Sequence, residues 1–511
     1  MEQKKMAAYD DLIAKVREIS LIETIGQIMN WDMEVYIPPA AFQQRGEQMA
    51  MLQRLQHRLL TNPEIGKLLN ELEQKTTFEK LNSVQQRNIL LARKAYDEAT
   101  KIPEELLAAL AKQRTIAVNV WRKAKTAKDW SIFEPDLLKL VDLVKQRAEI
   151  LMKVNNLATP YDALIDIFEP KMNQDTIARV FSDLRIRLVP LADRCIKASK
   201  SVDTKFLKRP ISIDNQRRIS NAITSFIDYD IASPEAGGRI DETEHPFTTG
   251  YYSDVRITTH YYEKNFTSSL YSVLHEGGHA IYEQNYPPEW KFQPIGDAAS
   301  YGIHESQSRF VENVVGRSPE FVRFFLPKIN KITGGVFKDI SVSDFVRAIN
   351  TVKRSKIRIE ADEVTYSLHV IIRFEIERDL FNGKISVKEL PNIWNEKYED
   401  YLGIAIKDDA EGALQDIHWA SGYFGYFPSY ALGNIYGGQF LAVMQRDLPD
   451  WQREIAAGKF STVKQWMVDH IHQKGRLYDP EELVYKVTGE RLNAQHFFDY
   501  LENKYKKLFK I

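Results

Sequence analysis

The sequence predicts a mainly helical protein with a small β-sheet beside a helix that carries two histidines. Apolar residues recur at helical spacing along most of the 511 residues. One stretch, from about 234 to 265, departs from this pattern and is rich in Gly, Pro, Thr and aromatic residues. The segment "SVLHEGGHAIYEQN" at 272–285 follows it directly. With 44% hydrophobic and 27% charged residues, the composition is that of an ordinary globular protein.

Helical periodicity is clearest in three segments of the N-terminal third. Residues 9–31, 104–125 and 133–154 each place apolar side chains along one stripe and charged side chains opposite. Pro103 and Pro170 are each typical of the first turn of a helix, so we expect helices to begin at these positions. Similar patterns return in the C-terminal third of the chain.

The exceptional stretch predicts the sheet. The string "SPEAGGRIDETEHPFTTG" at 233–250 is rich in Gly, Pro and Thr, and we expect an irregular connection there. The string "YYSDVRITTHYY" at 251–262 nearly alternates β-branched or aromatic residues with polar ones, which predicts one or two strands. A short sheet should therefore lie next to the helix that follows.

Composition excludes several classes of partner and site. The 69 basic and 70 acidic side chains nearly cancel, so we expect neither a nucleic-acid nor a membrane partner. Cys195 is the single cysteine, which excludes a disulfide within the chain and predicts a core-filling role. The N-terminus has no apolar stretch of secretory length, which favours a cytoplasmic location. Residues 419–445 lack charges but contain several glycines and a proline, so we expect buried interior rather than a membrane span.

The histidine-bearing segment predicts a metal site. His275 and His279 stand four residues apart, so their imidazoles project from one face of a helix and can bind the same cation. Glu276 lies about 100° around the helix, where it can act as a general base without binding the metal. Gly277 and Gly278 would weaken this helix. We expect one to admit a neighbouring helix and the other to face the substrate, or both to serve packing.

A catalytic zinc usually keeps three protein ligands and a fourth, open position. Downstream candidates for the third ligand are Glu283, Glu289, Asp297, His304, Glu305 and Glu312. Glu283 lies one turn further along the same helix, too collinear with both histidines to complete a tetrahedron. The string "ASYGIHESQSRFVENVVG" at 299–316 predicts a second helix, far enough along the chain to turn back antiparallel to the first. Spacing does not separate His304 from Glu305, and we prefer Glu305. His304 and Glu312 are then candidates for orienting the ligands.

Five motifs occur together along the chain. They are HExxH at 275–279, HES at 304–306, DxRxT at 254–258, IRxxAD at 357–362 and GxxQDxHW at 412–419. With these motifs the chain resembles the carboxypeptidase Taq family of HExxH zinc metallocarboxypeptidases. The strings "WDMEVYIPPAAFQQRGEQ", "YDALIDIFEP" and "HPF" extend the resemblance from residue 31 to about 440.

The resemblance implies a helical zinc-peptidase fold similar to thimet oligopeptidase and neurolysin, with a deep groove and the small sheet beside the HExxH helix. We expect a single peptidase domain over 1–511, in which two helical lobes could flank the groove. The resemblance further implies a homodimer that removes single C-terminal residues from peptides with broad side-chain tolerance. It places the metal on His275, His279 and Glu305, with Glu276 as the catalytic base.

Further site residues follow from the resemblance and from chemistry. Helical zinc peptidases use a tyrosine from a Gly-Tyr string to stabilise the oxyanion, which makes Tyr426 the first choice and Tyr423 the second. The terminal carboxylate of a substrate suits a bidentate arginine. Arg358 is favoured for this contact, and Arg256 for shaping the groove. His245 and His418 are further candidate donors in the groove.

The residues leave the native metal and the exact activity open. Zinc, one ion per chain, is expected from two histidines and a glutamate, although cobalt or another divalent ion suits the same ligands. The alternative activity is that of a helical zinc oligopeptidase, which cleaves internal bonds of short peptides. An alternative from another class is a helical binding or scaffold protein with a structural metal.

Overall fold

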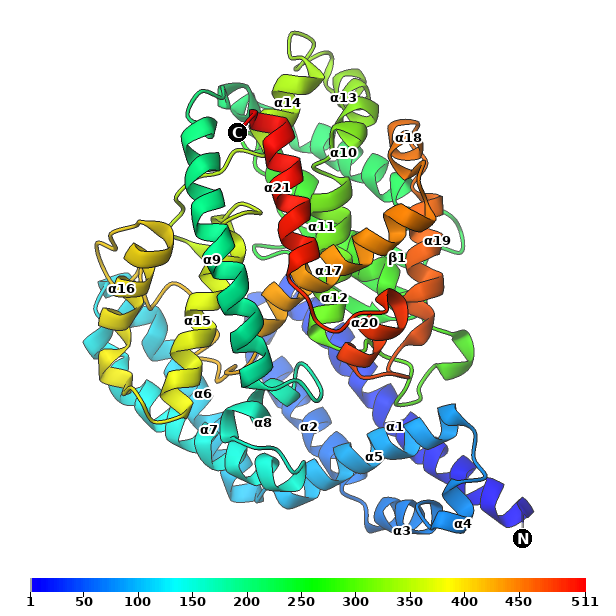
Figure 1. Cartoon of the computed structure of the whole chain (residues 1–511). Coiled ribbons are helices and arrows are strands. Elements are labelled where there is room, and N and C mark those ends of the chain that lie inside the picture. The colour runs from blue at the N-terminus through cyan, green and yellow to red at the C-terminus, as the bar shows by residue number, and fades with distance from the viewer. Residues whose placement is uncertain (1) are drawn as a thin grey trace.

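The computed structural model describes residues 2–511 of the chain, and side chains from residue 7 onward. Helices dominate it, as expected, and a three-stranded sheet lies near the middle of the sequence (Figure 1). The N-terminal helices are α1 Glu2–Val35, α2 Phe42–Leu60, α3 Pro63–Leu72, α4 Lys75–Phe78, α5 Ser83–Lys101, α6 Glu104–Ala127, α7 Glu134–Val154, α8 Pro160–Asp166, α9 Gln174–Ser199 and α10 Ile213–Phe226.

The remaining elements carry the motifs. The strands are β1 Gly238–Glu242, β2 Thr248–Tyr251 and β3 Asp254–Thr259. The central helices are α11 Phe266–Glu283, α12 Tyr301–Arg309, the π-helix η5 Phe310–Val315, α13 Pro319–Thr333, α14 Val342–Ile349, α15 Tyr366–Phe381 and α16 Leu390–Leu402. The C-terminal helices are α17 Phe427–Asp447, α18 Trp451–Ala456, α19 Ser461–His470, α20 Pro480–Thr488 and α21 Gln495–Phe509.

One predicted helix start is confirmed and the other is wrong. Helix α6 begins directly after Pro103, which supplies an extended residue at the N-cap. Pro170 lies instead in a turn, and α9 begins at Gln174. The side chain of Asn173 caps α9 by accepting a hydrogen bond from the backbone N–H of Thr176. A competing N-cap therefore sets this helix start.

The sheet is larger than the sequence predicts. Its strand order is β1-β3-β2, with β1 parallel and β2 antiparallel to β3. Strands β1 and β2 both fall in the segment expected to be an irregular connection, so that expectation is wrong. The sequence of β1, "GRIDE", has little strand propensity. Its backbone is satisfied by parallel pairing with β3, in register from Gly238 with Val255 to Glu242 with Thr259. Local pattern cannot reveal such a partner.

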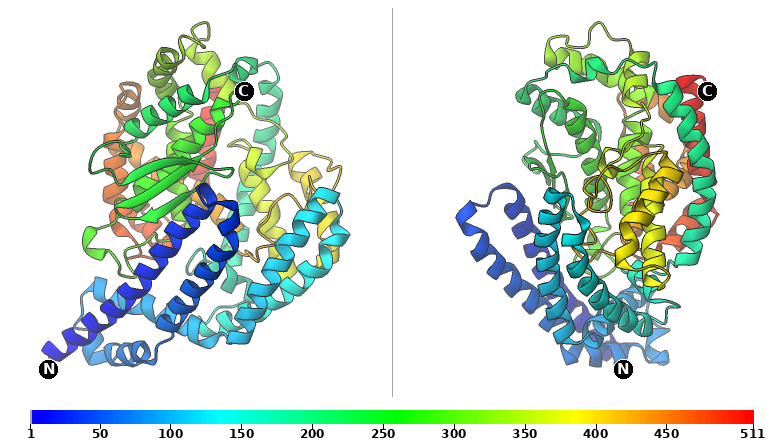
Figure 2. Two further views of the ribbon diagram at one scale, coloured as in Figure 1. Left: turned by 180° about the vertical axis from the view of Figure 1, so that it is seen from behind. Right: turned by 90° about the vertical axis from the view of Figure 1, so that its left-hand side faces the viewer.

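The sheet lies between the N-terminal helices and α11 (Figure 2). Strand β3 and α11 pack together, while α1 contacts β2. The Tyr36 hydroxyl donates a hydrogen bond of 2.8 Å to Asp241 on β1, and Thr243 donates to the Glu34 carbonyl at 3.0 Å. These contacts attach the end of α1 to the sheet that supports the HExxH helix.

The apolar core has two parts. A small cluster joins α1, α3 and α5 around the fully buried Leu12, Leu69 and Ile89. A much larger cluster fills the rest of the protein and includes most of the apolar residues of α17, a helix that is largely buried. The charge-poor segment 419–445 is therefore buried interior, as expected, and among residues 2–511 no helix combines the length and apolarity of a membrane span. Cys195 is buried in the large cluster, which confirms its core role.

Candidate functional site

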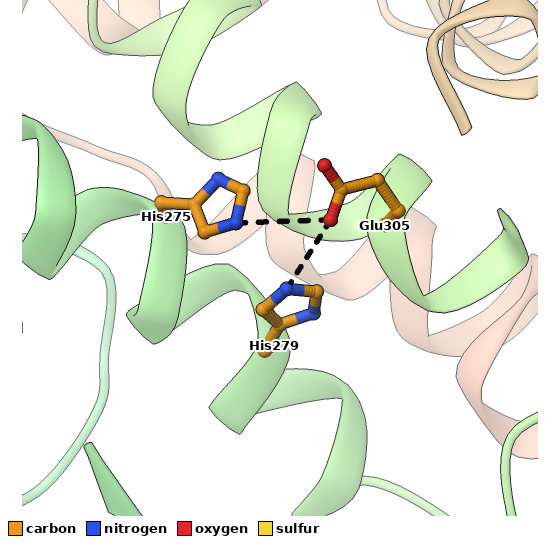
Figure 3. A group of neighbouring side chains, drawn as sticks. All are labelled: His275, His279 and Glu305. Carbon is orange, nitrogen blue, oxygen red and sulfur yellow. Dashed lines mark ion pairs between the residues drawn. The ribbon is translucent and has the colours of Figure 1, made fainter. Parts of the chain in front are cut away.

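The two histidines of α11 and the glutamate of α12 meet in space. The Nε2 atom of His275 lies 3.7 Å from Oε2 of Glu305, and Nε2 of His279 lies 3.5 Å from the same oxygen (Figure 3). One ligand atom from each of the three residues lies within 4.8 Å of the others. Helices α11 and α12 pack against each other, so the three donors converge from two elements.

A charged network holds Glu305 and His275. Arg309, one turn after Glu305, donates from Nε to Oε1 of Glu305 at 2.7 Å. Nδ1 of His275 lies 3.0 Å from Oε2 of Glu312. Arg317 in turn lies 3.2 Å from Oε1 of Glu312. Glu312 belongs to the π-helix η5 and stands seven residues, about two turns, after Glu305, so both carboxylates lie toward α11.

Buried charges set the protonation of this network. Burial raises the pKa of Glu305, but the Arg309 guanidinium and the two imidazoles outweigh it and lower that pKa well below its usual range. The pKa of Glu312 is lowered in the same way, mainly by Arg309 and His275. Burial, together with the charge of His304, lowers the pKa of His279 to about 3. Glu305 is therefore an ionised carboxylate and His279 a neutral imidazole, the forms that bind a metal. Burial lowers the pKa of His275, but Glu305 and Glu312 outweigh it and raise that pKa.

His304 lies against His279 rather than replacing Glu305. The Nδ1 atoms of His304 and His279 are in hydrogen-bond contact. On its other side, Nε2 of His304 lies 2.7 Å from Oε1 of Glu283. Glu283, set aside as a ligand because of its place on α11, is thus engaged by His304. Sequence spacing did not distinguish His304 from Glu305 as the third ligand. In the structure, Glu305 is the residue that joins His275 and His279 in the cluster.

Glu276 is buried beside the cluster. The hydroxyl of Thr248 on β2 donates a hydrogen bond of 2.7 Å to Oε2 of Glu276. Burial raises the pKa of Glu276, against the lowering effects of His275 and of the Thr248 hydrogen bond. A raised carboxyl pKa brings the group closer to the range in which it can exchange a proton at neutral pH. The small sheet therefore contributes directly to this carboxylate.

Both glycines of the HExxH helix serve packing. A Cβ at Gly278 would lie 2.7 Å from Cα of Ser308 and 2.8 Å from the carbonyl oxygen of Gln307, both in the backbone of α12. A Cβ at Gly277 would meet the end of the Ile227 side chain. Of the alternatives left open by the sequence, packing of both glycines is the one observed. Gly278 allows the close approach that brings Glu305 to the histidines.

We expect Gly278→Ala to destabilise the protein and Gly277→Ala to have little effect. Alanine favours a helix by about 1 kcal/mol over glycine. At Gly278 this gain is outweighed by overpacking against backbone, which typically costs about 1–3 kcal/mol. At Gly277 the Ile227 side chain can rotate away. Thermal unfolding of both variants would test the contrast, and equal midpoints would contradict it.

The chemistry of the donor set fits a divalent ion. Two imidazoles and one carboxylate are the ligands of one class of catalytic zinc site, which leaves a position open. The contact of Glu312 with Nδ1 of His275 is the kind of outer partner that fixes the orientation of a metal-binding histidine. His275, His279 and Glu305 are therefore the residues that would hold the ion.

The candidate oxyanion residues differ in their surroundings. Tyr426 is partly buried at the start of α17, and its ring centre lies 5.5 Å from that of Tyr301 at the start of α12. Burial, together with Tyr430 and the charge of Glu305, raises the pKa of Tyr426 well above its usual value, so its hydroxyl stays protonated. Tyr423 is 48% exposed. His418 stacks on Tyr426 at 5.5 Å, and burial with two nearby arginines lowers its pKa to about 4.

The candidate carboxylate-binding arginines both have an acidic partner already. Arg358 is buried and paired with Asp416 through two contacts of 3.1 and 3.2 Å, and its Nη1 lies 3.0 Å from the Tyr366 hydroxyl. The guanidinium also lies 5.0 Å from the ring centre of Tyr430. Arg256 makes a two-point contact with Asp254 on its own strand.

Arg256 and His245 lie in different settings. The Arg256 guanidinium lies over the ring of Trp31 at 4.2 Å, so it helps to hold α1 on the sheet. His245 is exposed in the connection between β1 and β2. Neither residue contacts the His275, His279 and Glu305 cluster in the interactions of the described residues.

Several residues at the site were not identified from the sequence. Arg309 could have been found, because it stands four residues after Glu305 on a predicted helix, where a salt bridge is favourable. Thr248 gave no such signal, since its contact with Glu276 depends on how the sheet packs on α11. Gly433 of α17 was also missed. A Cβ there would lie 2.8 Å from Cβ and Cγ of Glu305.

A mainly helical scaffold that joins an HExxH helix to a distant glutamate defines a helical metallopeptidase. A family profile described as "Carboxypeptidase Taq (M32) metallopeptidase" matches residues 11–505. The chain belongs to this family, as its motifs indicated, and is a metallocarboxypeptidase. The family assignment implies a divalent metal and favours an enzyme over the scaffold-protein alternative.

Similar proteins span almost the whole chain. A thermostable carboxypeptidase 1 from Thermus thermophilus is 40% identical over 98% of this chain and 99% of its own length. Carboxypeptidase 1 from Bacillus subtilis is 39% identical over 98% of this chain and 97% of its own. The crystal structure of the M32 carboxypeptidase from Deinococcus radiodurans matches with a TM-score of 0.94 at 34% identity, over 99% of this chain and all of that one. The expected fold class is thereby confirmed.

Proposed function

We propose that this carboxypeptidase releases single C-terminal residues from peptides with broad side-chain tolerance, with Glu276 as the general base. The observation that carries the proposal is the convergence of His275, His279 and Glu305 next to a buried Glu276. A bound divalent ion would polarise the scissile carbonyl and lower the pKa of water. Glu276 takes the proton from the attacking water and passes it to the departing amine.

Tyr426 is the proposed donor to the oxyanion. Its position beside Tyr301, at the start of the helix that carries Glu305, and its protonated hydroxyl support this role. Tyr423 remains the second choice because it is more exposed. His418, stacked on Tyr426 and neutral at pH 7, is a further candidate donor.

Arg358 is the proposed partner of the substrate's terminal carboxylate. It lies next to Tyr430, whose ring centre is 5.1 Å from that of Tyr426, so it adjoins the proposed oxyanion donor. The pairing with Asp416 fixes the plane of its guanidinium and leaves part of its hydrogen-bonding capacity free. Arg256 is proposed to shape the groove through the sheet, with His245 as an additional donor.

Zinc is the proposed metal, one per chain, with cobalt or another divalent ion able to use the same ligands. We also propose a cytoplasmic homodimer. Each chain forms a single peptidase domain, in which two helical lobes flank the substrate groove. The near balance of 69 basic and 70 acidic side chains supports the proposal that neither nucleic acid nor membrane is a partner.

Peptides with free and amidated C-termini test the proposal. We expect the zinc-loaded enzyme to shorten a free peptide one residue at a time and to leave its amidated twin intact, because the amide cannot pair with an arginine as a carboxylate does. Mass spectrometry of products over time would show the ladder. Equal cleavage of both peptides at an internal bond would instead support the oligopeptidase alternative.

A further inference from the structure

A pocket lies outside the candidate metal centre. It has a volume of about 400 Å³ and is formed by α6 and the loop that precedes α17. Arg114, Asn119 and Arg122 line it from α6, and Ser421 and Tyr423 line it from the loop. Its walls therefore combine two guanidinium groups with neutral hydrogen-bonding groups, and no acidic residue lines it.

The arginines around this pocket lack acidic partners. The Nε atoms of Arg114 and of the neighbouring Arg147 are buried without a hydrogen-bond partner in the described part of the chain. Burial lowers the pKa of Arg114, and burial with the charge of Arg114 lowers that of Arg147, so neither charge is compensated. Glu98 is the acid that acts on Arg147, but it is engaged by Asn155 at 2.7 Å and Lys94 at 3.8 Å.

The buried arginines Arg358 and Arg373 are paired with a carboxylate. The Nε atoms of Arg114 and Arg147, like those of Arg185 and Arg347, instead have no hydrogen-bond partner among the described residues. A buried donor without a partner costs free energy, because it has lost its water without gaining another acceptor. An anionic ligand would supply that acceptor.

The pocket adjoins the candidate active site through aromatic rings. Tyr423, in its wall, has its ring centre 6.2 Å from that of Tyr426. The Tyr426 ring contacts Tyr301 at 5.5 Å, and Tyr301 begins the helix that carries Glu305. The pocket is therefore linked to the helix that carries Glu305 by two contacts between tyrosine rings.

We propose that the pocket lined by Arg114 and Arg122 is a carboxylate-binding subsite for the peptide substrate. The proposal rests on the proposed function and adds a second anionic contact besides Arg358. Guanidinium groups bind carboxylates in two-point geometry, which suits both the terminal carboxylate and an acidic side chain of the substrate. Asn119 and Ser421 supply neutral hydrogen bonds in the same pocket.

The test compares Arg114→Gln/Arg122→Gln with Lys123→Gln, which removes one charge from the same helix outside the pocket lining. Matched peptides carry Glu or Gln at the last or the penultimate position, and kcat and KM are measured on the zinc-loaded enzymes. We expect the double variant to lose about 10- to 100-fold in kcat/KM, mainly through KM, because charged hydrogen bonds contribute this much. Its melting temperature should stay equal or rise, since the unpartnered Nε of the partly buried Arg114 is removed and Arg122 is exposed.

The pattern of loss identifies the carboxylate. A loss confined to Glu peptides assigns the subsite to an acidic side chain, and an equal loss for all free-acid peptides assigns it to the terminal carboxylate. A double variant that behaves like Lys123→Gln on every peptide would overturn the proposal. Calorimetric titration of the same peptides into both proteins in a Glu276→Gln background measures binding without turnover. If the wild type binds these peptides but does not release single residues, the proposed function is rejected and the subsite proposal stands.

Discussion

Replacing Glu276 by glutamine is expected to abolish peptide hydrolysis while the protein keeps its metal. Glutamine has nearly the same shape and can still accept the hydrogen bond from Thr248, which is 2.7 Å long in the structure. It cannot take a proton from water. General-base catalysis contributes about 10²- to 10⁴-fold, so kcat should fall by at least this factor. The proposed metal ligands His275, His279 and Glu305 are left unchanged.

Two measurements on one preparation check this expectation. Elemental analysis should find about one zinc per chain in Glu276→Gln, as in the wild type, and single-turnover assays should find little product. Glu105→Gln, which makes the same chemical change at an exposed position in the first turn of α6, serves as the control and should keep full activity. Wild-type turnover by Glu276→Gln would show that another group acts as the base.

The cluster proposed as the metal centre could be predicted from the sequence because its main parts are local. The HExxH spacing fixes two histidines on one helical face, whatever the rest of the chain does. Predicting Glu305 as the third ligand required one further step, the expectation of a second helix that returns to the first. The structure has that helix, and it brings Glu305 to within 3.5 Å of His279. Tertiary structure was needed only to separate Glu305 from His304.

The parts that were not predicted depend on pairing between distant segments. Strand β1 exists because β3 lies beside it, and "GRIDE" carries no signal of that partner. Thr248 reaches Glu276 only because β2 packs on α11. The start of α9 shows a different cause, since Asn173 caps the helix better than Pro170 starts it. The pocket beside Arg114 likewise needs α6 and the loop before α17, which are almost 300 residues apart in the sequence.

The charged network around the proposed ligands could be predicted only in part from the sequence. Glu312 was a candidate for orienting a ligand, but its partner could not be named. Residues seven apart in a helix lie on nearly the same face, so Glu312 falls on the same side as Glu305. In the structure both carboxylates reach α11, where Glu312 contacts His275. Which group of α11 Glu312 meets depends on how the helices pack, which apolar periodicity does not encode.

Replacing His279 by alanine is expected to remove the metal and, with it, all peptidase activity. The variant keeps His275 and Glu305, but two ligands cannot close the site. We expect affinity for zinc to fall by more than about 100-fold, because loss of a residue that merely orients a ligand already costs about 10- to 100-fold. Competition with a chromogenic chelator would measure the change. His57→Ala on α2 is the control and should bind zinc as the wild type does.

Thermal unfolding supplies a readout of metal loss that needs no substrate. A ligand that binds only the folded state stabilises it by about 4.1 kcal/mol when present at 1,000 times its dissociation constant. A chelator should therefore lower the melting temperature of the wild type and leave that of His279→Ala unchanged. If chelation shifted both proteins equally, the ion would be bound elsewhere. The apo wild type and the variant should also melt at similar temperatures, because Arg309 still pairs with Glu305 in both.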